Sequence, residues 1–197
     1  MTNTERKVAI VGAGLIGRAW ATIFARAGWN VRLTDPHIPT LKSAPRLIRD
    51  ELHALARHGL ASDPDGAVAR VSAAGNLEEA VRDVEFVQEN GPEKADDKRS
   101  IFAQLDKMAP RDALLVSSTS AITASRFTEH LQGRSRCLVG HPVNPPHLVP
   151  LVEVIQNERT SGEVVKRTTQ LLRQAGKVPV HVRRDIPGFV GNGFSTR

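Results

Sequence analysis

Two side chains in this sequence are suited to general acid–base chemistry, those of His141 and Glu153. A histidine can remove a hydroxyl proton near neutral pH if a carboxylate fixes its tautomer and stabilises the imidazolium. His141 opens the rigid turn His141-Pro-Val-Asn-Pro-Pro146, and Glu153 stands between two valines. A carboxylate with apolar neighbours must point to solvent or find a partner, because an isolated buried charge is costly. The spacing alone leaves open a solvent-facing Glu153 and a structural His141.

A second stretch has the residue types that bind a phosphate. An apolar, β-branched run at 8–11 is followed by the turn Gly12-Ala-Gly-Leu-Ile-Gly17. The first glycine permits a tight turn, the second leaves no Cβ between backbone and pyrophosphate, and the third lets a helix lie close to the strand. The free N–H groups of that helix attract anions, although an ordinary strand-to-helix turn is the alternative. The expected cofactor-binding residues of this turn are Gly12, Gly14, Leu15, Ile16 and Gly17.

Asp35 follows these glycines at the distance of the carboxylate that binds the adenosine ribose in dinucleotide-binding folds, about twenty residues. It ends an expected strand at 30–35. Pro36 and His37 come next, with no arginine to receive a 2′-phosphate, so the sequence favours NAD over NADP. A solvated turn residue at the strand end is the alternative role for Asp35.

These residues need a scaffold, and the hydrophobic pattern predicts one in which strands and helices alternate. The expected strands are 8–11, 30–35, 68–72, 84–88, 113–117, 136–140, 151–155 and 177–182. The expected helices are 16–27, 40–58, 76–82, 96–108, 123–131 and 160–175, with Pro45 kinking or restarting the second and a turn cluster at 62–66. This order predicts an α/β fold with a doubly wound, mostly parallel (Rossmann-type) sheet.

Small hydroxyl residues fill positions 117–120, at the end of the fifth expected strand. Such side chains can bind a ligand at the carboxyl edge of a parallel sheet. They can equally cap the helix expected at 123–131, which is their commoner use.

Five motifs, in one order, resemble the 3-hydroxyacyl-CoA dehydrogenase family over residues 6–192. They are Gly12-Ala-Gly-Leu-Ile-Gly-Arg-Ala-Trp20, Ile101-Phe-Ala-Gln-Leu-Asp106, Ser117-Ser-Thr-Ser120, His141-Pro-Val-Asn-Pro-Pro146 and Pro150-Leu-Val-Glu-Val154. The sequence looks most like the lambda-crystallin (L-gulonate 3-dehydrogenase) branch. Acyl-CoA enzymes more often read His-Phe-Phe-Asn-Pro at the fourth motif, and carnitine dehydrogenases are similar to this chain too.

The resemblance implies an NAD-dependent oxidoreductase that oxidises the 3-hydroxyl of a 3-hydroxy acid or 3-hydroxyacyl-CoA to the 3-keto form. His141 would take the hydroxyl proton, and Glu153 would pair with the imidazole. Ser120 would bind the substrate oxygen, and Asn192 of Gly188-Phe-Val-Gly-Asn192 would line the same site. The alternative is a truncated NAD-binding domain, or a crystallin-like structural protein, with little or no turnover.

Two further residues match cofactor-contacting positions of the family, Glu93 and Lys98. A solvated helix start is the alternative for both. NAD is the only cofactor expected, and no metal is.

The resemblance also divides the chain. Residues 1–186 would form the NAD-binding Rossmann domain, and 187–197 the truncated start of an interdomain linker. Family members continue into an all-helical domain, which we expect to be absent. The ending Gly193-Phe-Ser-Thr-Arg197 is what a one-base deletion in codons for Arg-Phe-Gln-His-Ala would encode. We hypothesise such a frameshift, which sequencing past the last codon would test.

Composition limits the partners. The net charge is +6, but the cations are scattered and the chain has two tryptophans and no tyrosine, so we expect no nucleic acid. No apolar run approaches membrane length and the N-terminus lacks a signal-peptide pattern, so we expect a cytoplasmic protein with no membrane partner. The single cysteine, Cys137, is expected in a buried strand. The expected partners are a small-molecule 3-hydroxy substrate and further copies of the chain, as a homo-oligomer.

Overall fold

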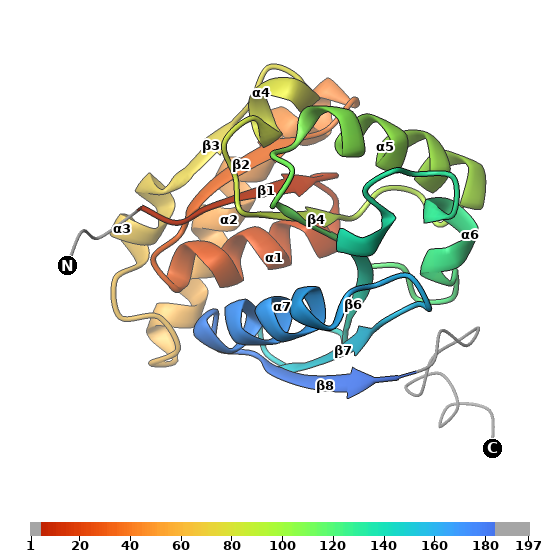
Figure 1. Ribbon diagram of the computed structural model, residues 1–197. Coiled ribbons are helices and arrows are strands. Elements are labelled where there is room, and N and C mark those ends of the chain that lie inside the picture. The colour runs from red at the N-terminus through yellow and green to blue at the C-terminus, as the bar shows by residue number, and fades with distance from the viewer. Residues whose placement is uncertain (1–4, 184–197) are drawn as a thin grey trace.

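The computed structural model describes residues 5–183, which form one eight-stranded sheet with helices on both faces (Figure 1). The strands are β1 Lys7–Val11, β2 Asn30–Thr34, β3 Val71–Ala73, β4 Phe86–Glu89, β5 Leu114–Ser117, β6 Cys137–Pro142, β7 Leu151–Ile155 and β8 Val178–Val182. Their order in the sheet is β3-β2-β1-β4-β5-β6-β7-β8. Every neighbouring pair is parallel except β6 and β7. The predicted doubly wound, mostly parallel sheet is confirmed.

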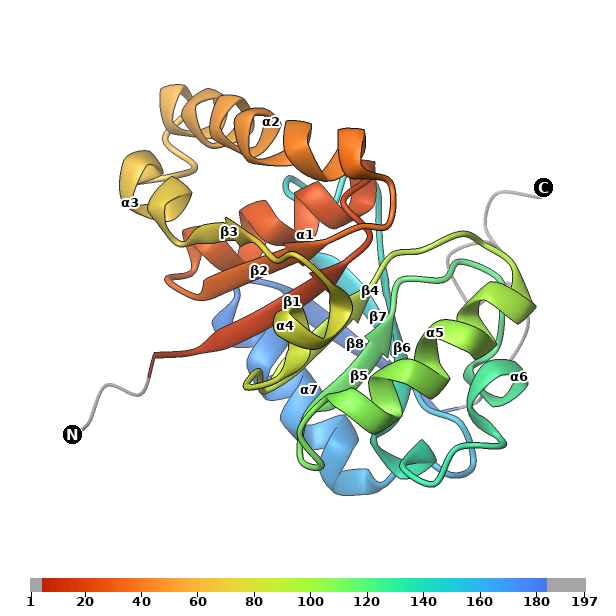
Figure 2. The same ribbon diagram turned by 90° about the horizontal axis from the view of Figure 1, so that it is seen from above.

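Two groups of helices cover the two faces of the sheet (Figure 2). The helices are α1 Leu15–Arg26, α2 Ile38–Arg57, α3 Pro64–Ala69, α4 Leu77–Val81, α5 Ala95–Met108, α6 Ala124–Thr128 and α7 Gly162–Gln174. Side chains of α1, α2 and α7 share one apolar cluster with the sheet, in which Trp20 and Phe24 stack. Side chains of α4, α5 and α6 share the other, in which Phe102 packs against Phe127. The central strands β1, β4 and β5 are therefore buried from both sides, as their apolar residues require, whereas the edge strands β3 and β8 stay partly exposed.

The strand order reverses beside β1, because β2 and β3 lie on one side of it and β4 to β8 on the other. Ligands of such sheets bind outside the carboxyl ends of the strands at this reversal. The carboxyl ends of β1, β4 and β5 are held in register there, with Val11 opposite Glu89 and Glu89 opposite Ser117. The fold thus brings the glycine turn, the loop after β4 and the hydroxyl cluster to one edge.

The segment 38–73 differs from its prediction in two ways. Helix α2 runs unbroken through Pro45, so the expected restart is wrong. Apolar residues before and after this proline share one buried face, and their packing outweighs the lost hydrogen bond. The expected turn at 62–66 begins a short helix instead, because Asp63 accepts a hydrogen bond from Gly66 N at 2.9 Å and Pro64 occupies the first helical position. Strand β3 consequently begins only at Val71.

Other boundaries shift by a few residues. Helix α6 ends at Thr128 and not at 131. Helix α7 begins at Gly162 and not at 160, and it is capped by Ser161, whose hydroxyl accepts from Val164 N at 3.2 Å. Strand β4 runs over Phe86–Glu89 and not over 84–88, and its last residue, Glu89, is fully buried. Within residues 5–183, none of the helices has both the length and the apolar character that a membrane span needs.

Candidate active site

The glycine turn has the backbone that its sequence predicts. Gly12 has a φ of +92°, which L side chains rarely adopt, and a Cβ there would lie 2.7 Å from Asn90 O. A Cβ on Gly17 would lie 1.8 Å from Gly12 O, so only glycine lets α1 pack this close to β1. A Cβ on Gly14 would meet nothing within 4 Å. Open space at Gly14, before a helix start whose N-cap carries no side-chain hydrogen bond, fits a bound pyrophosphate.

Asp35 lies against this turn. One carboxylate oxygen accepts from Ala13 N at 2.7 Å and the other from His37 N at 2.8 Å. These bonds fix the carboxylate directly after β2, beside the glycines. The geometry suits an acceptor for ribose hydroxyls, while the turn-residue alternative accounts only for the bond to His37.

His141 and Glu153 form a pair across β6 and β7. The two residues lie opposite each other in the antiparallel register, and His141 Nδ1 is 2.8 Å from Glu153 Oε2. Glu153 is 4% exposed. The solvent-facing alternative for this carboxylate is therefore wrong, and the pair has the geometry in which a carboxylate orients an imidazole.

A pocket of about 210 Å³ opens at the same edge of the sheet. The residues that line it are Ile16, Asn90, Gly91, Glu93, Lys98, Ser118, Ser120, His141, Pro142 and Asn144. Five of the predicted site residues thus meet in one pocket, which are Ile16, Glu93, Lys98, Ser120 and His141. Asn192, with the rest of 184–197, lies outside the described residues.

The side chain of Glu93 is held by the loop after β5. Its Oε1 accepts from Ser120 N at 2.9 Å, from Ala121 N at 3.1 Å and from the hydroxyl of Thr119. Burial alone would raise the pKa of Glu93, but the hydrogen bond from Thr119 and the charge of Lys98 outweigh it and lower that pKa. The N-cap of α6 is Thr123, which lies outside the cluster 117–120 and makes no side-chain capping bond, so the capping alternative does not account for this cluster.

Lys98 is 1% exposed, so the alternative of a solvated helix start is wrong for this residue. Its ammonium donates to both carboxylate oxygens of Glu89, each at 3.0 Å. Sequence reasoning missed Glu89. A charged residue directly after the expected strand 84–88 was the available signal, but its burial depends on a counter-charge nine residues later.

Ser118 is a second residue that sequence reasoning did not single out. Its hydroxyl accepts from Trp20 Nε1 at 2.9 Å and from Gln88 Nε2 at 2.7 Å, and donates to Asn90 Oδ1 at 2.7 Å. These bonds join α1 to the ends of β4 and β5 behind the pocket. The wall of the pocket is consequently built from three elements that the chain separates widely.

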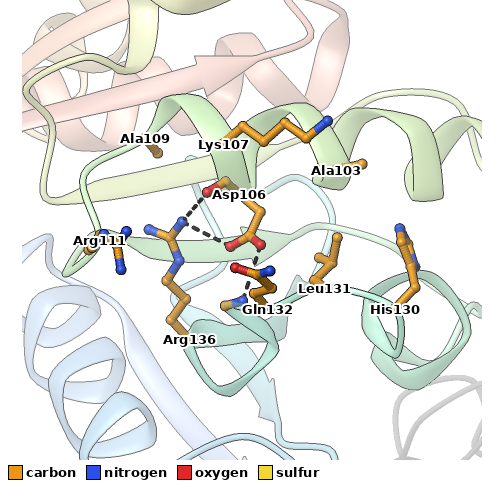
Figure 3. A pocket seen from close by; sticks show the side chains of 10 residues that line it. Ala103, Asp106, Lys107, Ala109, Arg111, His130, Leu131, Gln132 and Arg136 are labelled. Atoms are coloured by element: carbon orange, nitrogen blue, oxygen red, sulfur yellow. Dashed lines mark hydrogen bonds and ion pairs between the residues drawn. The ribbon is translucent and has the colours of Figure 1, made fainter.

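A larger cavity, of about 670 Å³, lies between α5 and the segment 130–136 (Figure 3). Asp106 and Arg136 form an ion pair in it at 3.0 Å, and Asp106 also accepts from Gly133 N. Arg136 further donates to backbone carbonyls, so both charges serve to tie α5 to this segment. Figure 3 shows Lys107 and Arg111 well apart from each other, and none of the predicted site residues lines this cavity.

Comparison with known proteins points to one family. The model of the 3-hydroxyacyl-CoA dehydrogenase NAD-binding domain matches residues 7–186. A lambda-crystallin homolog from Bos taurus is 42% identical over 188 residues, which are 94% of this chain and 59% of that protein. An L-carnitine dehydrogenase from Streptomyces coelicolor is 39% identical over 194 residues, which are 98% of this chain and 60% of that protein.

A solved structure has the same fold and belongs to an enzyme with a related name. The (S)-3-hydroxybutyryl-CoA dehydrogenase PaaH1 from Ralstonia eutropha superposes with a TM-score of 0.91 at 27% identity, covering 98% of this chain and 68% of that one. The present chain thus spans about three fifths of the length of the curated relatives just described.

Proposed function

The chain belongs to the 3-hydroxyacyl-CoA dehydrogenase family through its NAD-binding domain, and on that premise we propose that it oxidises the 3-hydroxyl of a small molecule with NAD as the hydride acceptor. The observation that carries this proposal is the His141–Glu153 pair beside a pocket at the carboxyl edge of the sheet. Such an edge is where dinucleotide-dependent enzymes of this fold place their chemistry.

The proposed proton path uses His141. Its Nδ1 is engaged with Glu153, so Nε2 would take the proton of the substrate hydroxyl. Glu153 would stabilise the imidazolium that forms, and Ser120 at the pocket wall would bind the substrate oxygen. General acid–base catalysis of this kind contributes about 10²–10⁴-fold to rate. Asn192 is proposed to line the same site, on the family motif alone.

NAD would be held at both ends. The turn of Gly12, Gly14 and Gly17, with Leu15 and Ile16, would bind the pyrophosphate, and Asp35 the adenosine ribose. Glu93 and Lys98, both in the wall of the pocket, would contact the nicotinamide half. We propose that NAD is preferred over NADP, because a 2′-phosphate would meet the charge of Asp35.

The substrate class follows from the relatives. One is named for carnitine and one solved structure for 3-hydroxybutyryl-CoA, and both molecules carry a hydroxyl at carbon 3. We propose a 3-hydroxy acid or 3-hydroxyacyl thioester for this chain, in a cytoplasmic setting. The motif His141-Pro-Val-Asn-Pro-Pro146 favours a small polar acid of the lambda-crystallin branch.

We propose that residues 1–186 form the NAD-binding domain, that 187–197 begin an interdomain linker and that the chain assembles as a homo-oligomer. Apolar side chains beside Glu153 support assembly, since Leu151, Val178 and Val180 lie on its face of the sheet and are 36%, 55% and 47% exposed. Light scattering tests the proposal, and a clean monomer would contradict it.

A cofactor-binding domain with little or no turnover is the second candidate. Exclusion of water and substrate orientation contribute about 7–11 kcal/mol in well-oriented sites, and this chain spans only about three fifths of the length of its curated relatives. A steady-state assay with NAD and a panel of 3-hydroxy substrates separates the candidates. Substrate-dependent reduction of NAD supports the enzyme, whereas NAD binding by calorimetry with no reduction for any substrate supports the second candidate.

A further inference from the structure

We propose that Glu89 is a positioning residue of the cofactor site, which holds the ammonium group of Lys98 at the pocket wall and acts on NAD only through that group. This inference rests on the proposed function. It concerns a residue that lies behind the pocket wall and does not line the pocket itself.

Glu89 is completely buried, and its carboxylate accepts four hydrogen bonds. It receives Lys98 Nζ on both oxygens at 3.0 Å, Ser117 Oγ at 2.5 Å and Gly91 N at 2.6 Å. A carboxylate has about four acceptor sites, and these four bonds occupy them. Glu89 therefore offers nothing further to a ligand, and its influence must pass through its partners.

Lys98 is the partner that reaches the ligand space. It is the fourth residue of α5, is 1% exposed and lines the pocket together with His141 and Ser120. Two of its three N–H donors point to Glu89, and Glu93 Oε2 lies 3.7 Å away on its other side. A lysine ammonium on a flexible stem has no fixed direction of its own, so the two bonds to Glu89 decide where its third donor points.

Glycine at position 91 lets the loop lie directly against this carboxylate. A Cβ on Gly91 would lie 2.9 Å from Glu89 Oε1, which is closer than real Cβ contacts. Gly91 is also part of the pocket wall. Gly91 thus contacts the Glu89 carboxylate on one side and lines the pocket on the other.

A double-mutant cycle on NAD affinity tests the proposal, with calorimetry on Glu89→Gln, Lys98→Met and the double variant. We expect each single variant to weaken NAD binding about tenfold, the worth of one charge-assisted hydrogen bond. The double variant should bind no more weakly than Lys98→Met alone, because Glu89 acts through Lys98. Independent contributions of the two residues to NAD binding would instead multiply in the double variant. Lys107→Met, an exposed lysine of the same helix, is the control and should bind NAD as the wild type does.

Thermal unfolding of each variant shows whether a loss of NAD affinity comes from a loss of folded protein. If Glu89→Gln does not fold, Glu89→Asp replaces it, since this variant keeps the counter-charge but draws it back by one methylene. Affinity within about twofold of wild type for the folded Glu89 variant, or single-variant losses that multiply in the double variant, would overturn the role of Glu89. Failure of the wild type to bind NAD would instead contradict the proposed function.

Discussion

His141 Nδ1 lies 2.8 Å from Glu153 Oε2 because the two residues face each other across β6 and β7, the antiparallel pair of the sheet. A parallel β7 would carry Glu153 in another register. The antiparallel direction of β7 therefore places the carboxylate of Glu153 beside His141. Because Glu153 is buried, its charge needs a partner, and the imidazole provides one.

The first prediction concerns this pair. His141→Ala or Glu153→Ala should lower turnover about 10²–10⁴-fold, because the proton acceptor or its orienting group is lost. NAD affinity should stay nearly unchanged, since neither residue belongs to the turn that binds the pyrophosphate. Steady-state kinetics and calorimetry measure the two quantities. His181→Ala, an exposed histidine of β8, is the matched control. Wild-type turnover in either site variant would mean that the site is misplaced.

A second prediction separates the glycines. Gly14→Ala should leave the free energy of unfolding within about 0.5 kcal/mol of wild type, because a Cβ at this position meets no atom within 4 Å. The same substitution should weaken NAD binding, because the new Cβ stands where the pyrophosphate must approach the backbone. Gly17→Ala should cost about 1–3 kcal/mol of unfolding free energy, because its Cβ collides with Gly12 O. Equal effects of the two substitutions on stability would argue against the described packing of α1 on β1.

Asp35 gives the third prediction. Asp35→Ala should weaken NAD binding and narrow the preference over NADP, since it removes both the ribose acceptor and the charge that repels a 2′-phosphate. Calorimetry with both dinucleotides checks it. Equal or tighter binding of NADP by the wild type would count against the assignment of Asp35.

The fourth prediction concerns pH and a site away from the pocket. Hydrogen bonds from Arg32 and then Lys7 lower the pKa of Asp83 from 3.8 to about 2. A carboxyl whose folded pKa is depressed stabilises the fold above its unfolded pKa, and this contribution is lost as pH falls through the folded value. Asp83→Asn should therefore unfold more easily than wild type at neutral pH, and the difference should shrink between pH 4 and pH 2. Melting curves across that range, with exposed Asp112→Asn as control, provide the test.

Most helices and strands of the sheet could be predicted from the sequence, because the residues that start and stop them lie close to them in the chain. The glycine turn, the apolar period of α1 and α5 and the side-chain caps of α4 and α7 lie within a few residues of the elements they begin. The misplaced elements had competing local signals, as at Asp63, where one side-chain cap turned an expected loop into a helix.

The site was predictable only in part. Spacing left Glu153 undecided between solvent and a partner, and resemblance to the family singled it out, since strand direction cannot be derived from a twelve-residue interval. Neither the residue spacing nor the family resemblance singled out Glu89. Its burial depends on Lys98 and on the hydroxyl of Ser117, which the sheet brings to it from the next strand.

Transfer of deuterium tests the central claim most directly. The wild-type chain would be incubated with NAD and with L-carnitine or 3-hydroxybutyryl-CoA deuterated at carbon 3, and the nicotinamide and the product analysed by mass spectrometry. We predict deuterium on the reduced nicotinamide in an amount equal to the 3-keto product, and about 10²–10⁴-fold slower transfer with His141→Ala. A protein saturated with NAD that yields neither 3-keto product nor labelled nicotinamide from either substrate, nor from a panel of other 3-hydroxy acids, would contradict the account.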